Sequence, residues 1–218
     1  MGMTIKRQKK EQGRMYGGES AADRLARQRQ QFMDAGLELF GTAGYRATTV
    51  RMLCKQAGLI DRYFYKNFVD TEDLLAAVYA EAIDGIQATV LNALAPELAS
   101  GNAERIVAAG LGAFFAAYEN PRVARVCWLE VLGVSTRIDA LYIQRIERFA
   151  DLLTTLAKTL VPEMKLHPDD MQFTGFGLVG AISQSAMQWL LSDYRAERQH
   201  LVAANTRLLL GAMQMLRA

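Results

Sequence analysis

The sequence predicts an all-α fold, and three observations lead to this prediction. Apolar residues recur every three or four positions along most of the 218 residues, which is the period of an amphipathic helix. No segment alternates apolar and polar residues as a half-buried strand would. Hydrophobic residues make up 51% of the chain and only 4 prolines interrupt it, so a substantial helical core is expected.

The first predicted helix follows a polar, basic tail. Residues 1–19 are predicted to be disordered, with a tail that lies along DNA as the alternative. Ser20 is suited to cap a helix that runs to about residue 43. Its apolar face carries Phe32, Ala35, Gly36, Leu39 and Phe40, and Gly41 and Gly44 end it.

Two short helices come next. Thr48 or Thr49 caps the first of them, which has Val50, Leu53, Cys54 and Ala57 on one face. Gly58 supplies the turn. The second short helix covers about residues 60–67, with Phe64 and Phe68 facing inward.

A much longer helix is predicted over residues 71–94, capped by Asp70 and ended by Pro96. It would span roughly 36 Å and connect two domains. Further helices are expected at about 103–119, 121–133, 137–160, 169–192 and 196–217. The predicted domains are therefore residues 20–70 and residues 71–218.

Charge is unevenly distributed between these two parts. Residues 1–70 hold 13 Lys/Arg against 7 Asp/Glu, whereas residues 71–218 hold 12 against 16. A basic first third indicates a domain that binds a polyanion. The acidic remainder indicates a body with another role.

The segment 42–75 has the pattern of a helix-turn-helix. Two short helices are joined by a glycine turn, and the second is rich in polar and aromatic side chains. The first helix must bury Val50, Leu53 and Cys54 so that the second is held at a fixed angle. The second helix must present hydrogen-bond donors to the major groove of double-stranded DNA.

This segment resembles the N-terminal signature of the TetR family of repressors over about 45 residues. The matching positions are Phe40, Gly44, Tyr45, Ala47, Thr48, Thr49, Val50, Arg51, Ala57, Gly58, Leu59, Tyr65, Phe68, Glu72, Leu74 and Leu75. The resemblance implies a three-helix DNA-binding domain, a linking fourth helix, and a C-terminal helical domain for ligand binding and dimerisation.

The resemblance also implies which residues touch DNA. Thr49 and the start of its helix would contact phosphate, as would Tyr65, while Arg62, Tyr63 and Lys66 would reach base edges. Packing is the alternative role for Tyr63 and Tyr65. The full predicted set is Arg46, Thr48, Thr49, Arg51, Asp61, Arg62, Tyr63, Tyr65, Lys66, Asn67 and Thr71.

Three positions depart from the family's common pattern. Ile60 stands where Ser or Thr usually caps the recognition helix, so Asp61 is expected to satisfy the free N–H groups there. Thr71 replaces a phosphate-binding Lys, and Asn67 replaces an aromatic residue or His. These departures leave the operator sequence unpredicted.

The helical body is expected to hold a small hydrophobic or aromatic effector, because aromatic residues are spread over its helices. Glu130 would favour a cationic effector if it faces inward. The predicted ligand-binding residues are Phe114, Tyr118, Trp128, Glu130, Phe149, Phe176, Gln184 and Gln188. Small residues near 175–186 favour a homodimer formed through helices 169–192 and 196–217.

Other functional classes find little support in the sequence. Gly175, Gly177 and Gly180 satisfy a dinucleotide-binding spacing, but no strand precedes them. The two histidines do not form a metal pattern, Cys54 and Cys127 are expected to be reduced core thiols, and no catalytic set or cofactor is predicted. No apolar run of membrane-spanning length or signal peptide is evident, so a cytoplasmic location is expected.

The sequence thus predicts a homodimeric repressor that a small hydrophobic effector releases from a pseudo-palindromic operator. One alternative is a regulator that acts through DNA alone or as an activator. Another is a helical enzyme or binding protein whose helix-turn-helix is only structural.

Overall fold

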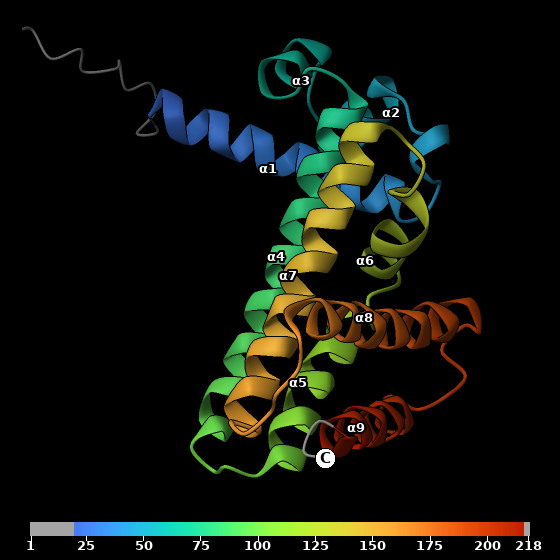
Figure 1. The fold of residues 1–218 in the computed structure, drawn as a ribbon. Helices are drawn as coiled ribbons and strands as arrows, with labels where there is room; N and C mark the ends of the chain where they lie inside the picture. The colour runs from blue at the N-terminus through green and yellow to red at the C-terminus, as the bar shows by residue number, and fades with distance from the viewer. Residues whose placement is uncertain (1–19, 216–218) are drawn as a thin grey trace, which may run out of the picture.

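A computed structural model describes residues 20–215, and every regular element in this range is helical (Figure 1). The basic tail predicted at residues 1–19 lies outside the described residues. The elements are α1 (Ala21–Phe40), η1 (Tyr45–Ala47), α2 (Val50–Ala57), α3 (Asp61–Asn67), α4 (Thr71–Leu98), α5 (Ala103–Ala117), α6 (Pro121–Arg125), η2 (Val126–Glu130), α7 (Thr136–Leu160), α8 (Pro168–Leu191) and α9 (Arg198–Met215).

Helices α1, α2 and α3 form a small head around the start of α4 (Figure 1). The predicted caps Ser20, Thr49 and Asp70 each accept a backbone N–H of the helix they precede. Gly58 ends α2 with a φ of 67°, a left-handed conformation that glycine adopts without a steric cost. The turn between α2 and α3 is thus the one the sequence predicts.

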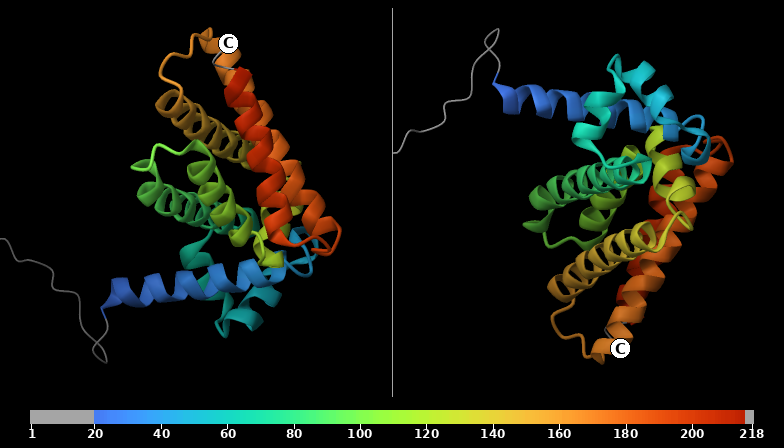
Figure 2. Two further views of the ribbon diagram at one scale, coloured as in Figure 1. Left: turned by 90° about the horizontal axis from the view of Figure 1, so that it is seen from below. Right: turned by 90° about the horizontal axis from the view of Figure 1, so that it is seen from above.

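The body is built on α4 and α7, which run side by side away from the head (Figure 1). Helix α5 packs along α4, α8 packs on α7, and α9 packs on α5. Helices α8 and α9 therefore lie next to each other on the side of the body away from α4 (Figure 2).

Two predicted boundaries need correction. Helix α4 does not end before Pro96 but continues to Leu98. Proline removes one backbone hydrogen bond, and so close to the end of a helix few others depend on it. The helix predicted at 121–133 is a short α6 followed by the π-helical segment η2, which ends at Glu130.

Helix α4 is also long and apolar enough, by length and composition, to meet a criterion for crossing a membrane. This differs from the expectation that the sequence contains no apolar run of membrane-spanning length. In the structure Leu74, Leu75, Ile83, Ile86 and Val90 of α4 are buried among other helices. Its apolar character is therefore that of a core helix.

Candidate DNA-binding surface and body cavity

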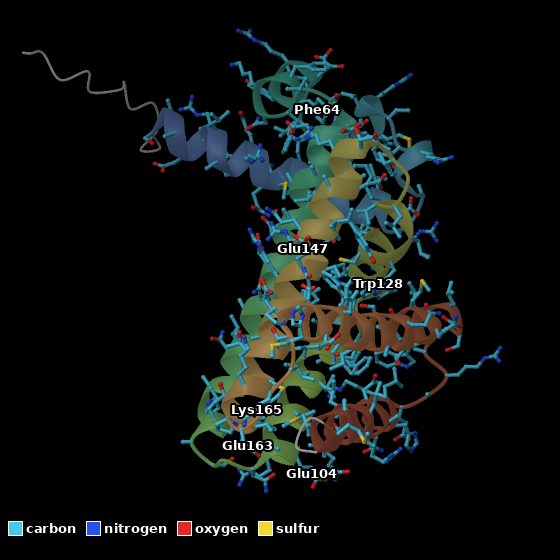
Figure 3. The ribbon with its side chains drawn as sticks, viewed as in Figure 1. Phe64, Glu104, Trp128, Glu147, Glu163 and Lys165 are labelled. Carbon is cyan, nitrogen blue, oxygen red and sulfur yellow. The ribbon has the colours of Figure 1, made fainter. Side chains whose placement is uncertain are left out.

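Helix α3 is anchored by Phe64, which leaves its polar side chains facing solvent (Figure 3). Phe64 is fully buried, and its ring meets the ring of Phe32 edge-on with 5.3 Å between the centroids. Rings in this geometry gain about 0.5–1.5 kcal/mol beyond their buried area. Arg62, Tyr65 and Lys66 are exposed, Tyr65 to 62%. Three predicted DNA contacts therefore lie on the outer surface of the head.

The start of α2 brings further polar and basic side chains to the surface of the head. The hydroxyl of Thr49 accepts the backbone N–H of Met52 at 3.3 Å and remains exposed. Arg46 and Arg51 are exposed as well. So is Lys55, which the sequence analysis did not single out. Its spacing of four residues from Arg51 on one helix face was a usable signal.

Two of the residues predicted to contact DNA form hydrogen bonds inside the head instead. Thr48 is only 7% exposed, and its hydroxyl donates to the carbonyl of Gly44 at 2.8 Å. The side-chain amide of Asn67 donates to the carbonyl of Tyr63 at 2.7 Å. This geometry corrects the prediction for Thr48, which lies inside the surface rather than on it, and gives Asn67 a role in ending α3.

Tyr63 and Thr71 are half-buried, in line with the packing alternative considered for Tyr63. The ammonium group of Lys66 lies 5.5 Å from the centroid of the Tyr63 ring. A cation over an aromatic face at this distance is attracted by the ring. The Tyr63 ring therefore helps to position the ammonium group of Lys66, independently of any contact between Tyr63 and a base.

The N-terminus of α3 has the compensation expected for Ile60. Ile60 occupies the N-cap position, and its side chain makes no capping bond. The carboxylate of Asp61, the first residue of α3, accepts the backbone N–H of Arg62 at 2.7 Å. Asp61 thus satisfies one of the free N–H groups from inside the helix rather than from the cap.

The head is joined to the body by a hydrogen bond to Glu130 of η2 and by an ion pair from Arg122 of α6. The carboxylate of Glu130 accepts the backbone N–H of Tyr45 at 2.8 Å and the guanidinium N–H of Arg125 at 3.0 Å. Arg122 pairs with Glu38 of α1. The side chain of Glu130 is only 12% exposed, so these bonds are largely shielded from solvent.

A second fastening joins the start of α4 to the start of α7. Arg137 donates to Asp73 at 2.8 Å, and the hydroxyl of Ser135 donates to Glu72 at 2.9 Å. The hydrogen bond from Arg137 lowers the pKa of the Asp73 carboxyl below its ordinary value. Because α7 also borders the cavity described below, this contact connects the body with the base of the head.

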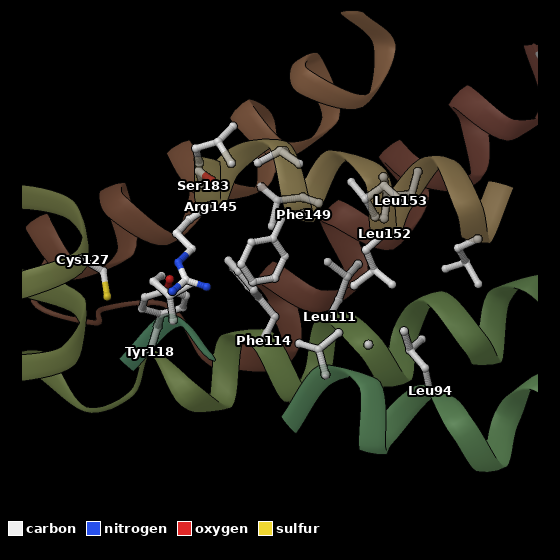
Figure 4. Close-up of a pocket in the computed structure, with 18 of the residues that line it drawn as sticks. Leu94, Leu111, Phe114, Tyr118, Cys127, Arg145, Phe149, Leu152, Leu153 and Ser183 are labelled. Atoms are coloured by element: carbon white, nitrogen blue, oxygen red, sulfur yellow. The ribbon is translucent and has the colours of Figure 1, made fainter. Parts of the chain in front are cut away.

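The body contains a cavity between α4, α5, α7, α8 and η2 (Figure 4). The cavity has a volume of about 80 Å³. The cavity is therefore narrow. Phe114 and Phe149 lie near its middle, between Tyr118 on one side and Leu152 on the other (Figure 4).

The structure brings half of the predicted ligand-binding residues together at this cavity. They come from three different elements, which sequence spacing alone does not relate to one another. The tilted rings of Tyr118 and Trp128 have centroids 5.0 Å apart. The residues concerned are Phe114, Tyr118, Trp128 and Phe149.

The other four predicted ligand-binding residues do not line the cavity. Glu130 faces the head, where it accepts the backbone N–H of Tyr45, and Arg125 of α6 neutralises its carboxylate, so it does not favour a cationic effector in the cavity. Phe176 packs near Phe173 on α8, with 6.4 Å between ring centroids. Gln184 and Gln188 point to solvent from the outer side of α8.

Sequence reasoning missed Arg145, the one charged side chain among the described residues that line the cavity. Arg145 of α7 is buried, and its guanidinium pairs with Asp84 of α4. Its spacing of three residues from Tyr142 and four from Phe149 puts it on the apolar face of α7. A charged residue in the middle of that apolar face was the signal that could have found it.

The tyrosine hydroxyls and the cysteine thiol in the cavity wall stay protonated at neutral pH. Burial raises the pKa of the Cys127 thiol to about 12 and raises the pKa of the Tyr118 hydroxyl well above its ordinary value. Burial also raises the pKa of Tyr79 and, to a smaller extent, that of Tyr142. These groups therefore bring no negative charge to the cavity at neutral pH.

Within residues 20–215, no group of three or more His, Cys, Asp or Glu side chains is arranged to hold a metal ion. Cys54 is half-buried and Cys127 is buried, and both are free thiols. The glycine spacing at residues 175–180 lies within the helix α8, where no strand and no phosphate-binding loop are present.

Comparisons with known proteins agree with this geometry. The profile described as bacterial regulatory proteins of the tetR family matches residues 32–78. The HTH-type transcriptional regulator BetI of Escherichia coli O127:H6 is 28% identical over 156 residues, which are 71% of this chain and 77% of BetI.

Solved structures are similar over most of the chain. The fatty acid degradation regulator FadR of Bacillus halodurans has a TM-score of 0.69 and 20% identity, covering 84% of this chain and 95% of that one. FadR of Bacillus subtilis, solved in complex with stearoyl-CoA, has a TM-score of 0.67 and 18% identity, covering 83% and 96%. A tetR-family regulatory protein from Rhodococcus RHA1 has a TM-score of 0.67 and 19% identity, covering 87% and 96%.

At these identities the solved structures establish the fold, while the family profile and BetI carry the relationship in sequence. The profile covers α2, α3 and the residues of α1 and α4 that pack against them. With the exposed cations of α3 and the all-α body, these similarities support a DNA-binding transcriptional regulator of the TetR type.

Proposed function

We propose that this protein is a homodimeric repressor that leaves a pseudo-palindromic operator when a small hydrophobic effector fills the body cavity. The observation that carries the proposal is α3, where buried Phe64 turns Arg62, Tyr65 and Lys66 outward. Such a helix can enter the major groove, with its cations and hydroxyl donating to base edges and phosphates. Residues 20–70 are then the DNA-binding domain and residues 71–218 the effector-binding and dimerisation domain of a cytoplasmic protein.

Two unpartnered helix faces support the homodimer. On α8, Phe173 and Leu191 are 71% and 56% exposed, and Gly177, Gly180 and Gln184 lie exposed between them on the same face. On α9, the described part of the chain leaves Leu208 and Met215 45% and 77% exposed. Adjacent apolar faces with small residues fit a two-fold packing of α8 and α9 against the same helices of a second copy.

The cavity supports control by an apolar effector, because its lining is aromatic and aliphatic except at one end. FadR of Bacillus subtilis, a protein of the same fold, was solved in complex with stearoyl-CoA, a ligand that carries a long apolar chain. An effector acts only if it binds the DNA-bound and the free conformation with different affinity.

The segment η2 offers a route from the cavity to the head. Trp128 borders the cavity, and two residues later Glu130 holds the backbone of Tyr45. An effector that displaces Trp128 would therefore shift the carboxylate that positions the head. The movement of α4, which lines the same cavity and begins beneath α3, would add to this effect.

Salt dependence of DNA binding tests the proposal. With duplex DNA from immediately upstream of the protein's own gene, we expect the affinity to fall steeply with salt, since each neutralised phosphate contributes about 0.9 to the logarithmic slope. Lys66→Ala removes a cation that would donate to a base edge and should weaken binding. Lys158→Ala, which removes an exposed cation on α7 far from the head, is the matched control and should leave binding unchanged.

Binding can be measured by fluorescence anisotropy from low to moderate salt concentration. Equal effects of Lys66→Ala and Lys158→Ala, or a complete lack of salt-dependent binding, would contradict the proposal. The latter result would favour a helical enzyme or binding protein with a purely structural helix-turn-helix. Binding that increases transcription from the bound promoter would instead identify an activator.

A further inference from the structure

The cavity differs in chemistry between its two ends (Figure 4). Tyr118, Cys127 and Arg145 gather at one end, and Leu94 and Leu152 lie toward the other. The lining on α7 runs from Tyr142 to Leu156, which is about 21 Å along the helix axis. A narrow, elongated space of this kind fits an extended chain with a polar head better than a broad planar molecule.

Arg145 lacks one hydrogen-bond partner at the polar end. Its side chain is only 9% exposed, and both terminal nitrogens donate to Asp84. The third nitrogen, Nε, is buried and has no partner among residues 20–215. A buried N–H without an acceptor is destabilising, and an acceptor atom of a ligand would satisfy it.

The positive charge near Arg145 also exceeds the negative charge of Asp84. Arg148 lies 3.8 Å from the same carboxylate, so two guanidinium groups share one aspartate. None of the described residues that line the cavity is an aspartate or glutamate. The polar end is therefore suited to an acceptor with partial or full negative charge.

Trp128 supplies a second donor without a partner. Its indole Nε1 is buried, is unpaired and belongs to a residue of the same cavity wall. Indole can only donate, and a guanidinium likewise has no acceptor atom. Two unpaired donors thus border one cavity whose remaining surface is almost entirely apolar.

From these observations we propose that the cavity binds an unbranched aliphatic chain ending in an acyl group, as in a fatty acid or its thioester. The acyl oxygens accept hydrogen bonds from Arg145 Nε and Trp128 Nε1, and the alkyl chain extends along α7 toward Leu94 and Leu156. This inference deepens the effector role proposed above and rests on this cavity being the effector site.

Direct binding to the full-length protein without DNA tests the head group. Isothermal titration calorimetry with dodecanoate, dodecanoyl-CoA and dodecanol compares three heads on one chain. We expect at least one acyl compound to bind about ten-fold or more tightly than dodecanol, because hydrogen bonds to charged groups are worth more than neutral ones. Whichever of dodecanoate and dodecanoyl-CoA binds more tightly shows whether the natural ligand is a free fatty acid or its thioester. Dodecanol binding as tightly as both would overturn the inference.

Three variants test the two donors. Trp128→Phe removes Nε1 and keeps an aromatic ring, and Arg145→Met removes Nε together with the bonds to Asp84. Each should weaken acyl binding several-fold and leave dodecanol binding unchanged. Lys158→Met is the matched control, since it removes an exposed cation of α7 that neither lines the cavity nor pairs with Asp84. If Arg145→Met does not fold, as judged by its melting curve, Trp128→Phe decides. An unchanged affinity for the acyl compounds in Trp128→Phe would contradict the inference.

Failure of this inference and failure of the proposed function give different results. Acyl binding that depends on Trp128 and Arg145 but leaves DNA affinity unchanged would retain the ligand class and contradict effector control. Release of DNA by dodecanol and dodecanoate alike would retain effector control and overturn the assigned head group.

Discussion

Thr48 and Thr49 are adjacent in extended backbone, so their side chains face opposite sides of the chain. Thr48 points inward and donates to Gly44, whereas Thr49 points outward and caps α2. Gly44 has a φ of 92°, a conformation that suits glycine, and the bond from Thr48 holds its carbonyl in place. Thr48 therefore stabilises the turn before α2, and Thr49 is available for contacts at the surface of the head.

This difference predicts unequal effects on DNA binding. Thr48→Val and Thr49→Ala should each lower the free energy of unfolding by about 1 kcal/mol, the first through a lost hydrogen bond and the second through a lost cap. Only Thr49→Ala should also weaken DNA binding when both variants are fully folded. Urea unfolding and anisotropy titrations measure the two quantities. Weaker DNA binding by Thr48→Val than by Thr49→Ala would contradict the assignment.

At the scale of single residues, the sequence predicted which residues form the site better than it predicted which way their side chains point. The family signature includes both threonines, but only backbone geometry tells which one is buried. Arg145 was missed for a related reason. Its partner Asp84 and the donor Trp128 lie on other helices, and the chain spacing does not show that they meet.

Among the elements, the π-helical segment η2 links the cavity and the head. A π turn holds one more residue than an α turn, which rotates the side chains that follow it. Trp128 thereby faces the cavity while Glu130 reaches Tyr45. Sequence periodicity predicted one helix over 121–133, because five residues are too few to distinguish a π turn from an α turn.

Removing the Glu130 carboxylate should loosen this link. In Glu130→Ala the backbone N–H of Tyr45 loses its acceptor, and we expect faster amide hydrogen exchange in the peptide that contains Tyr45. Glu147→Ala removes an exposed carboxylate on α7 and serves as the control. Mass spectrometry of exchanged peptides measures both. Equal exchange in Glu130→Ala and the unchanged protein would show that Glu130 does not hold the head.

Helix starts were predicted more reliably than helix ends. Ser20 and Asp70 were predicted as caps, and Thr49 as one of two candidates with Thr48, because their side chains offer acceptors at the right place. The end of α4 was placed too early because a proline near a C-terminus disrupts little, and its effect there depends on packing around it.

For the whole molecule, the proposed homodimer would place its two heads through the outer faces of α8 and α9. The sequence predicted the helices and their small residues, yet it assigned Gln184 and Gln188 to the cavity. Both lie on the outer side of α8, the side that carries Gly177 and Gly180. Which side of an apolar helix stays exposed depends on its neighbours α7 and α9, and these are known only from the assembled fold.

The central claim is that a homodimer binds DNA sequence-specifically through its two heads. Selection of bound duplexes from a random DNA pool tests this claim most directly. The unchanged protein should enrich inverted repeats whose half-sites are separated by about one helical turn, roughly 10 base pairs. Phe173→Glu places a charge in the proposed dimer face and should abolish enrichment of the repeat. Enrichment of no sequence, or of single asymmetric sites by the unchanged protein, would contradict a dimeric, sequence-specific regulator.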